Sequence, residues 1–378
     1  MKKILVVFGT RPEIIKLAPV IEELKKRKSF KIFTCSTGQH KEMLNQMEEI
    51  FNLKADYNLN LMTPDQNLFD LTSDALQKLK KLIAEVGPDL LIIQGDTTTA
   101  FAAALSAFYN KIKVAHVEAG LRSWNNYSPY PEEVNRKIIS TISNIHFAPT
   151  KNAKDNLVNE GVSAKNIWVT GNTVTDALLK IKEELDKPLT SAKIKMQLKN
   201  LLPEDFFEKK FILITMHRRE KFGENLVKIL RTLKELAFEK KEYNFVYPVH
   251  MNPNINLPVH KELFAIPNFY LVPPLDYFSF IYLMKYCHFI ISDSGGIQEE
   301  CYVFRKPIIV LRDVTEREEA IEAGYAFLAG DTPLKKIFYN VDKKLGEKFN
   351  FFKVKNPFGN GKAAIKIADT TEKYLSKL

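Results

Sequence analysis

Short apolar runs alternate with longer amphipathic stretches along the first half of the chain. The apolar runs predict strands at 4–8, 31–36, 89–93 and 113–117. The stretches between them repeat apolar residues every three or four positions and predict helices at 14–28, 41–51, 68–86 and 100–109. Strands that alternate with helices over short connections are typical of a doubly wound parallel sheet.

The pattern changes between residues 176 and 200, which are rich in Lys and Glu and contain no strand candidate. A second series of strands follows at 211–215, 243–247, 269–272, 289–292 and 307–311. Because 378 residues exceed the usual size of a single core, two domains are expected. We predict two Rossmann-like α/β domains that face each other across a cleft. They span residues 1–175 and 201–360, with a helical junction at 176–200 and a final helix in 361–378 that crosses back to the first domain.

Composition narrows the class of protein. The hydrophobic fraction of 45% and charged fraction of 26% are those of a soluble globular chain. The net charge of +10 is not gathered into a basic block, so we expect neither nucleic acid nor a membrane as a partner. Cys35, Cys287 and Cys301 have no metal-ligand spacing, which predicts reduced core thiols in a cytoplasmic protein without a bound metal. The apolar run after Met1 is too short for a signal peptide.

The segment 292–300 carries the first chemical signal. Ser294, Gly295 and Gly296 follow a predicted strand and precede a helix predicted at 297–304, so bare backbone N–H groups there can receive an anion. Glu300, about one turn into the helix, can accept hydrogen bonds from a diol such as a ribose. A nucleotide diphosphate offers both groups. The structural alternative is an ordinary turn between strand and helix.

Carboxylates stand near the strand ends of the first domain. Asp96, Glu118 and Glu132 are the acids, and Arg11 and Lys16 follow the first strand. Carboxyl ends of parallel strands meet at one edge, which predicts a shared crevice. The alternative is that each acid is a helix cap or a solvated loop residue, and the three threonines after Asp96 suit a cap.

The second domain adds cationic residues at strand ends. His217 and Arg218 follow its first strand, and Arg317 follows its last. His250 follows the second strand, and we interpret it as structural. Walker A, nucleophile-elbow, HExxH and GxGxxG patterns are absent, which argues against ATP hydrolysis, metalloprotease chemistry and ordinary dinucleotide binding. An anion and diol clamp in one domain and carboxylates in the other would suit the transformation of a nucleotide-linked sugar.

Nine short motifs along the chain match those of a known family. The motifs at 8–13, 38–40, 95–99, 116–122, 128–136, 170–173, 217–220, 292–300 and 312–313 stand in the order found in non-hydrolysing UDP-N-acetylglucosamine 2-epimerases. The chain resembles that family over almost its whole length. The resemblance implies a GT-B architecture and a cytoplasmic homodimer without cofactor or metal. It also implies interconversion of UDP-GlcNAc and UDP-ManNAc, which feeds polysaccharide or glycan synthesis.

The resemblance also implies roles for individual residues. Those expected to hold the nucleotide and its diphosphate are Arg11, Lys16, His217, Ser294, Gly295, Gly296 and Arg317. Glu300 would bind the ribose, and Phe280 with Leu275 would face the uracil. Asp96, Glu118 and Glu132 would surround the sugar and, with His217, form the catalytic set. Either Asp96 or Glu118 would act at C2, and Glu132 would orient the sugar or move a second proton.

Bacterial members of the family also bind UDP-GlcNAc as an activator. Gln39, His40, Arg218 and His250 remain at the matching positions, but Glu42 and Asp65 replace Gln and Arg of some relatives, which leaves activation open. The rival functions are a GT-B glycosyltransferase, a hydrolysing 2-epimerase that releases ManNAc and UDP, and a nucleotide-sugar sensor.

Overall fold

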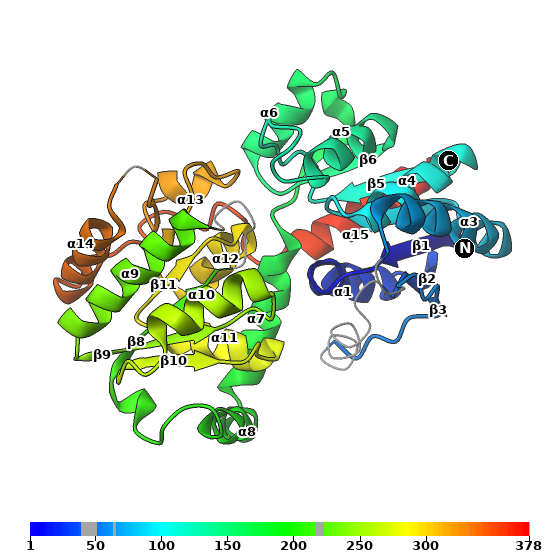
Figure 1. Ribbon diagram of the computed structural model, residues 1–378. Helices are drawn as coiled ribbons and strands as arrows, with labels where there is room; N and C mark the ends of the chain where they lie inside the picture. The colour runs from blue at the N-terminus through cyan, green and yellow to red at the C-terminus, as the bar shows by residue number, and fades with distance from the viewer. Residues whose placement is uncertain (39–50, 63–65, 217–222, 331, 378) are drawn as a thin grey trace. The chain divides into compact units, whose positions relative to one another are not determined.

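Figure 1 presents a computed structural model, which describes residues 1–38, 51–62, 66–216, 223–330 and 332–377. The chain divides into two compact units. The first contains Met1–Ala177 and Phe358–Leu378, and the second contains Leu178–Pro357. Each unit is a parallel sheet covered by helices. The prediction of two doubly wound Rossmann-like domains is therefore confirmed.

The first unit contains a seven-stranded sheet in the order β3-β2-β1-β4-β5-β6-β7. Its strands are β1 (Lys2–Phe8), β2 (Phe30–Ser36), β3 (Tyr57–Asn58), β4 (Leu90–Gln94), β5 (Lys113–Val117), β6 (Ile145–Ala148) and β7 (Ile167–Val169). All neighbouring strands are parallel. The strand order reverses direction between β1 and β4. Their carboxyl ends are therefore the topological switch point, where open α/β sheets bind ligands.

Helices of the first unit form a layer on each face of this sheet. They are α1 (Arg11–Lys25), α3 (Leu68–Val86), α4 (Thr98–Tyr109), α5 (Glu132–Ile142), α6 (Lys151–Asn159), α15 (Ala363–Leu375) and the start of α7 (Thr173–Asp186). The α3, α4 and α5 helices pack side by side, and α15 packs against α1. Right-handed crossovers that run in opposite directions from the switch point place these two groups on opposite faces. The α15 helix is tied to the first unit by Asp369, which lies 2.5 Å from Arg27.

The second unit repeats this plan with six strands in the order β10-β9-β8-β11-β12-β13. They are β8 (Lys210–Thr215), β9 (Tyr243–Pro248), β10 (Phe269–Val272), β11 (Phe289–Ser292), β12 (Ile308–Val310) and β13 (Ala326–Leu328). Its helices are α8 (Pro188–Lys199), α9 (Glu224–Glu239), α10 (Pro253–Leu263), α11 (Tyr277–Tyr286), α12 (Gly295–Glu300), α13 (Glu318–Glu322) and α14 (Leu334–Gly346). The switch point of this sheet lies between β8 and β11.

Hydrophobic periodicity located the long elements well and the short strands poorly. The α3 helix has its predicted bounds, because its buried residues repeat at helical spacing and Gly87 caps it in the left-handed conformation. The strands β3, β6, β7 and β13 were not predicted; each has four residues or fewer, although β10, β11 and β12 are as short and were predicted. The helix predicted at 41–51 lies outside the described residues. The helix predicted at 297–304 begins at Gly295 and becomes a 3-10 turn (η4, Cys301–Phe304).

Cys35, Cys287 and Cys301 are free and buried, as expected for thiols of the core. Within the described parts of the chain, no helix is both long and apolar enough to cross a membrane.

Gly120, directly after β5, lets two elements approach closely. It adopts φ +94°, and a Cβ placed there would lie 2.1 Å from the carbonyl oxygen of Ala153 on α6. Gly161 has a similar φ of +87°, but no atom lies within 4 Å of its Cβ position. A comparison of substitutions at Gly120 and Gly161 therefore separates the cost of a left-handed backbone from the cost of steric overlap.

We expect Gly120→Ala to destabilise the protein more than Gly161→Ala. Both alanines carry the left-handed backbone penalty of about 1–2 kcal/mol, and overlap with Ala153 adds about 1–3 kcal/mol at position 120 only. Urea denaturation measures both free energies of unfolding. Equal losses for the two variants would contradict the close packing of α6 on this turn.

Candidate functional site

The structure brings five of the candidate residues to the carboxyl edge of the first unit. Arg11 begins α1 after β1, Asp96 follows β4, Glu118 follows β5, and Glu132 begins α5. Lys16 lies one turn and a half into α1. Because the strands are parallel, these residues share the edge that contains the switch point.

Glu118 is held by an ion pair with α1. The Lys16 ammonium lies 2.8 Å from Oε1 and 2.6 Å from Oε2 of Glu118, and the Gln94 amide donates to Oε2. The exposed fractions of the two charged side chains are 12% and 4%. Glu118 also has a left-handed φ of +66°, which turns its side chain out of the strand direction. The carboxylate is therefore fixed by β4 and α1 together.

Asp96 is held by α5. Both Nε and Nη2 of Arg136 lie 2.7 Å from Oδ2 of Asp96, and Asn135 donates to the Asp96 carbonyl oxygen at 2.9 Å. The fully buried Glu133 binds Nη1 of Arg136 at 3.1 Å. The alternative in which Asp96 caps the next helix is wrong, because the side chain of Thr97 caps α4 by accepting from the Ala100 N–H.

Glu132 begins α5 and is partly buried. The neighbouring Glu133 holds the preceding loop by accepting from the N–H groups of Ser123 and Trp124 at 3.0 and 3.1 Å. The two adjacent acids therefore have different roles: Glu133, which holds the loop, is structural, whereas Glu132 remains a candidate for the sugar site.

Glu13 also lies at the carboxyl edge of the first unit, and the sequence did not lead us to predict a role for it. Its Oε2 accepts from the N–H groups of Gly9 and Thr10 at 2.9 and 2.7 Å, and its Oε1 accepts from the Thr97 hydroxyl at 2.7 Å. It thereby joins the turn after β1 to the turn after β4. Burial raises the pKa of Glu13, and the hydrogen bonds from Thr97 and Thr10 oppose that shift. Its signal in the sequence was a capping box, with Thr10 three residues before Glu13.

The second unit places Ser294, Gly295 and Gly296 at its own switch point. Ser294 is the N-cap of α12, and the two glycines are its first two residues rather than a separate turn before the helix. A Cβ on Gly295 would lie 2.8 Å from Nη1 of Arg317, so a larger residue there would require the guanidinium to shift. The Cβ position of Gly296 lies 3.7 Å from Oε1 of Glu300, which places that carboxylate beside the first turn.

Arg317 is fixed beside this turn by two buried acids. Its Nε lies 2.8 Å from Glu299 and its Nη1 lies 2.5 Å from Glu316. Arg312 also contacts Glu316, at 2.6 Å. A guanidinium held on both sides presents a defined direction to an anion.

Leu275 and Phe280 are partly buried residues near the carboxyl end of β10. Asp276 caps α11 by accepting from the Ser279 N–H at 3.0 Å, which fixes the first turn that carries Phe280. His250 accepts from the Asn252 N–H at 3.1 Å through Nδ1, a local turn contact. Gln39, His40, His217 and Arg218 lie outside the described residues. In the part of the chain that the structure describes, no group of three or more His, Cys, Asp or Glu residues could hold a metal ion.

Two Rossmann-like units with polar residues at their switch points define a protein of the GT-B type. The family model described as UDP-N-acetylglucosamine 2-epimerase matches residues 22–372. The chain belongs to the UDP-N-acetylglucosamine 2-epimerase family. A UDP-N-acetylglucosamine 2-epimerase of Campylobacter jejuni is 45% identical over 373 residues, which are 97% of this chain and 96% of the relative.

Solved structures of the family match as well. UDP-GlcNAc 2-epimerase from Neisseria meningitidis bound to UDP-GlcNAc is 43% identical with a TM-score of 0.92, and the match covers 98% of this chain and 100% of that chain. UDP-GlcNAc 2-epimerase from Methanocaldococcus jannaschii in complex with UDP-GlcNAc and UDP is 32% identical with a TM-score of 0.82, over 98% of this chain and 99% of that chain.

We expect Glu13→Ala to lower the free energy of unfolding by about 2–4 kcal/mol, because it leaves two buried N–H groups and a hydroxyl without their acceptor. Glu22→Ala on the same helix is the matched control, since Glu22 is exposed and its surface ion pair with Lys26, at 3.8 Å, is worth about 0.5 kcal/mol or less. Thermal and urea unfolding measure both. A Glu13→Ala protein as stable as the control would show that this residue does not join the two turns.

Proposed function

We propose that this chain interconverts UDP-GlcNAc and UDP-ManNAc without hydrolysis, as an isomerase that supplies ManNAc-containing polysaccharide or glycan synthesis. The observation that carries the proposal is the pair of held carboxylates, Asp96 and Glu118, at the carboxyl edge of the first unit's sheet. The proposal also draws on the family and on relatives whose structures contain UDP-GlcNAc and UDP.

In this proposal the second unit holds the UDP moiety. Arg317 lies against Gly295, and the first N–H groups of α12 adjoin it, so the diphosphate would meet a fixed cation and backbone donors. Ser294 and Gly296 would line the same site, and Glu300 would accept from the ribose hydroxyls. Phe280 would pack on the uracil, with the backbone of Leu275 at its edge. His217 would contact the diphosphate and take part in catalysis.

The first unit would hold the sugar. Asp96, Glu118 and Glu132 would surround it, and Arg11 would neutralise the diphosphate. Lys16, expected on the diphosphate, already donates to Glu118. In this proposal Lys16 would contact a phosphate oxygen while it keeps Glu118 in place.

Chemistry explains why carboxylates are needed. The proton on C2 is not adjacent to a carbonyl, so a base cannot remove it from the intact sugar. When the bond between C1 and the diphosphate oxygen breaks, C1 becomes cationic and the C2 proton becomes acidic. A carboxylate takes that proton and leaves a 2-acetamidoglucal. Return of a proton to the opposite face of C2, with re-addition of UDP at C1, gives the epimer. Each such proton transfer contributes about 10² to 10⁴ in rate.

We further propose that the enzyme works in the cytoplasm as a homodimer, with an apolar face of the first unit as its interface. Apolar residues that are not fully buried lie along three neighbouring helices, α3, α4 and α5. Phe69, Phe108, Val134 and Ile138 are exposed, and Leu76, Phe101 and Leu105 are partly buried. Phe69 is 87% exposed, and it is the grouping of such residues on one face, rather than a single one, that points to an interface.

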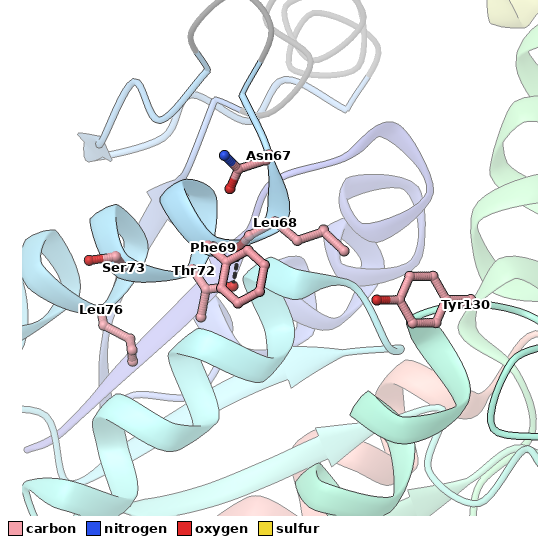
Figure 2. Close-up of a pocket in the computed structure, with 7 residues that line it drawn as sticks. All are labelled: Asn67, Leu68, Phe69, Thr72, Ser73, Leu76 and Tyr130. Atoms are coloured by element: carbon pink, nitrogen blue, oxygen red, sulfur yellow. Dashed lines mark hydrogen bonds between the residues drawn. The ribbon is translucent and has the colours of Figure 1, made fainter.

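A cavity of about 620 Å³ opens on the same face. Figure 2 shows Leu68, Phe69 and Leu76 of α3 on one side of it and Tyr130, just before α5, on the other. A second copy would meet this face with the same face, since a two-fold axis pairs identical surfaces. Apolar contact between the two copies would remove the cavity lining from water.

Incubation with UDP-GlcNAc in D2O tests the reaction. We expect proton NMR to show deuterium at C2 of both recovered UDP sugars, because the removed proton exchanges with solvent. Glu118→Gln and Asp96→Asn are expected to lower the rate of epimerisation by about 10² or more and to leave UDP affinity largely intact. Asp89→Asn, an acid outside the site, is the control.

Other results would favour the rival functions. UDP that accumulates steadily by phosphorus NMR indicates hydrolysis. UDP sugar without deuterium at C2 contradicts epimerisation and leaves a glycosyltransferase, and UDP binding without turnover leaves a sensor. Loss of UDP affinity in both acid variants would contradict the roles given to Asp96 and Glu118.

For the interface, Phe69→Glu combined with Phe108→Glu is expected to produce monomers. A buried Phe stabilises by about 1.5–3 kcal/mol and each substitution occurs twice in a dimer, so the dissociation constant should rise at least about 100-fold. Analytical ultracentrifugation measures it. Phe264→Glu, which changes a 73% exposed Phe of the second unit, is the control. A variant that remains dimeric would exclude this face.

A further inference from the structure

Gly95, in the turn between β4 and Asp96, forms two hydrogen bonds to β5. Gly95 leaves β4 with a left-handed φ of +75°. Its N–H donates to the Val117 carbonyl oxygen at 3.0 Å, and its own carbonyl oxygen accepts from Nε2 of His116 at 2.7 Å. Both backbone polar groups of Gly95, the residue before Asp96, are therefore fixed by consecutive residues of the neighbouring strand, His116 and Val117.

The imidazole of His116 is held in one chemical form. Burial lowers the pKa of His116 to about 3, although the hydrogen bond to Gly95 opposes that shift; His146 and Arg122 lower it slightly further, and Asp96 raises it slightly. The ring is therefore neutral near pH 7. Since Nε2 faces a carbonyl oxygen, Nε2 carries the proton. Nδ1 is buried and has no hydrogen-bond partner among the described residues, so no second group competes for the ring.

The Asp96 carboxylate is also oriented. Arg136 uses two nitrogens on the same oxygen, Oδ2. Within the residues that the structure describes, Oδ1 receives no hydrogen bond, and the side chain is 24% exposed. Oδ1 is therefore the oxygen available to a ligand, and its direction depends on the backbone of the turn that His116 and Asn135 hold.

We propose that His116 is a positioning residue for the reaction: its Nε2–H holds the Gly95 peptide and so aims Oδ1 of Asp96 at the sugar. This inference rests on the proposed function, because it takes Asp96 as a group that contacts the substrate. His116 itself does not touch the substrate.

The chain offers a matched control in His146. It lies opposite His116 in the register of β5 and β6, is equally buried, and its pKa is likewise lowered by burial, to about 4. Its hydrogen bond goes to the backbone at Ser143 and not to the Gly95 turn. His146→Phe therefore imposes a similar packing change on the same sheet without removing the donor to Gly95.

The test compares three variants of the full-length enzyme in the conversion of UDP-GlcNAc. His116→Phe removes the donor, and we expect kcat to fall about 10- to 100-fold, the size of effect caused by a misplaced catalytic group, with KM changed by no more than about twofold. His116→Gln keeps an N–H near the position of Nε2 and is expected to restore kcat to within about fivefold of the wild type. His146→Phe should keep wild-type kcat. Thermal unfolding of all three identifies any loss of folded protein.

Two results would overturn the inference. One is equal loss of kcat in His116→Phe and His146→Phe, which would make the effect a general one of packing. The other is a His116→Gln enzyme no more active than His116→Phe, which would show that the donor is not what matters. Failure of the proposed function is a separate result, since the wild-type enzyme would then place no deuterium at C2.

Discussion

The structure depends most on one constraint, that buried charged groups must stay paired. The ion pair between Lys16 and Glu118 is its clearest example. Both charges are almost entirely buried at the end of a parallel strand, where removal from water costs several kcal/mol per ion. Such a pair adds little net stability. Its effect is geometric, because each buried charged group has to remain against its partner. The edge of the sheet that carries the proposed chemistry is therefore an array of paired charges with few available arrangements.

The same constraint recurs at the other charged positions. Arg136 links Asp96 to the buried Glu133, and Arg317 lies between Glu299 and Glu316. In each case an arginine contacts two acids at once and therefore has few other conformations. A ligand that binds beside it then causes a smaller loss of conformational entropy. Glycine allows this at Gly295, where any side chain would displace Arg317. Both units thus keep charged groups in place before any ligand arrives.

This arrangement fits a reaction that proceeds through a neutral glucal and a free diphosphate. Neither species is covalently attached to the protein, so acids that take and return the C2 proton gain from fixed positions. Asp96 and Glu118 are fixed by different partners, one a guanidinium on a single oxygen and the other an ammonium on both oxygens. The two acids therefore offer a ligand different geometries, which suits a reaction with two faces.

Periodicity, turn chemistry and motif order determined the two doubly wound domains, the α3 helix and the position of the Ser294–Gly296 segment, because these depend on residues close together in the chain. Tertiary structure alone decided which groups pair. Lys16 and Glu118 are 102 positions apart, and Thr97 meets Glu13 across 84. Local sequence indicated Asp96 as a cap, although its carboxylate binds Arg136 forty positions away. The physical reason is that charge pairing depends on which strands lie side by side in the sheet, and strand order is a property of the whole fold.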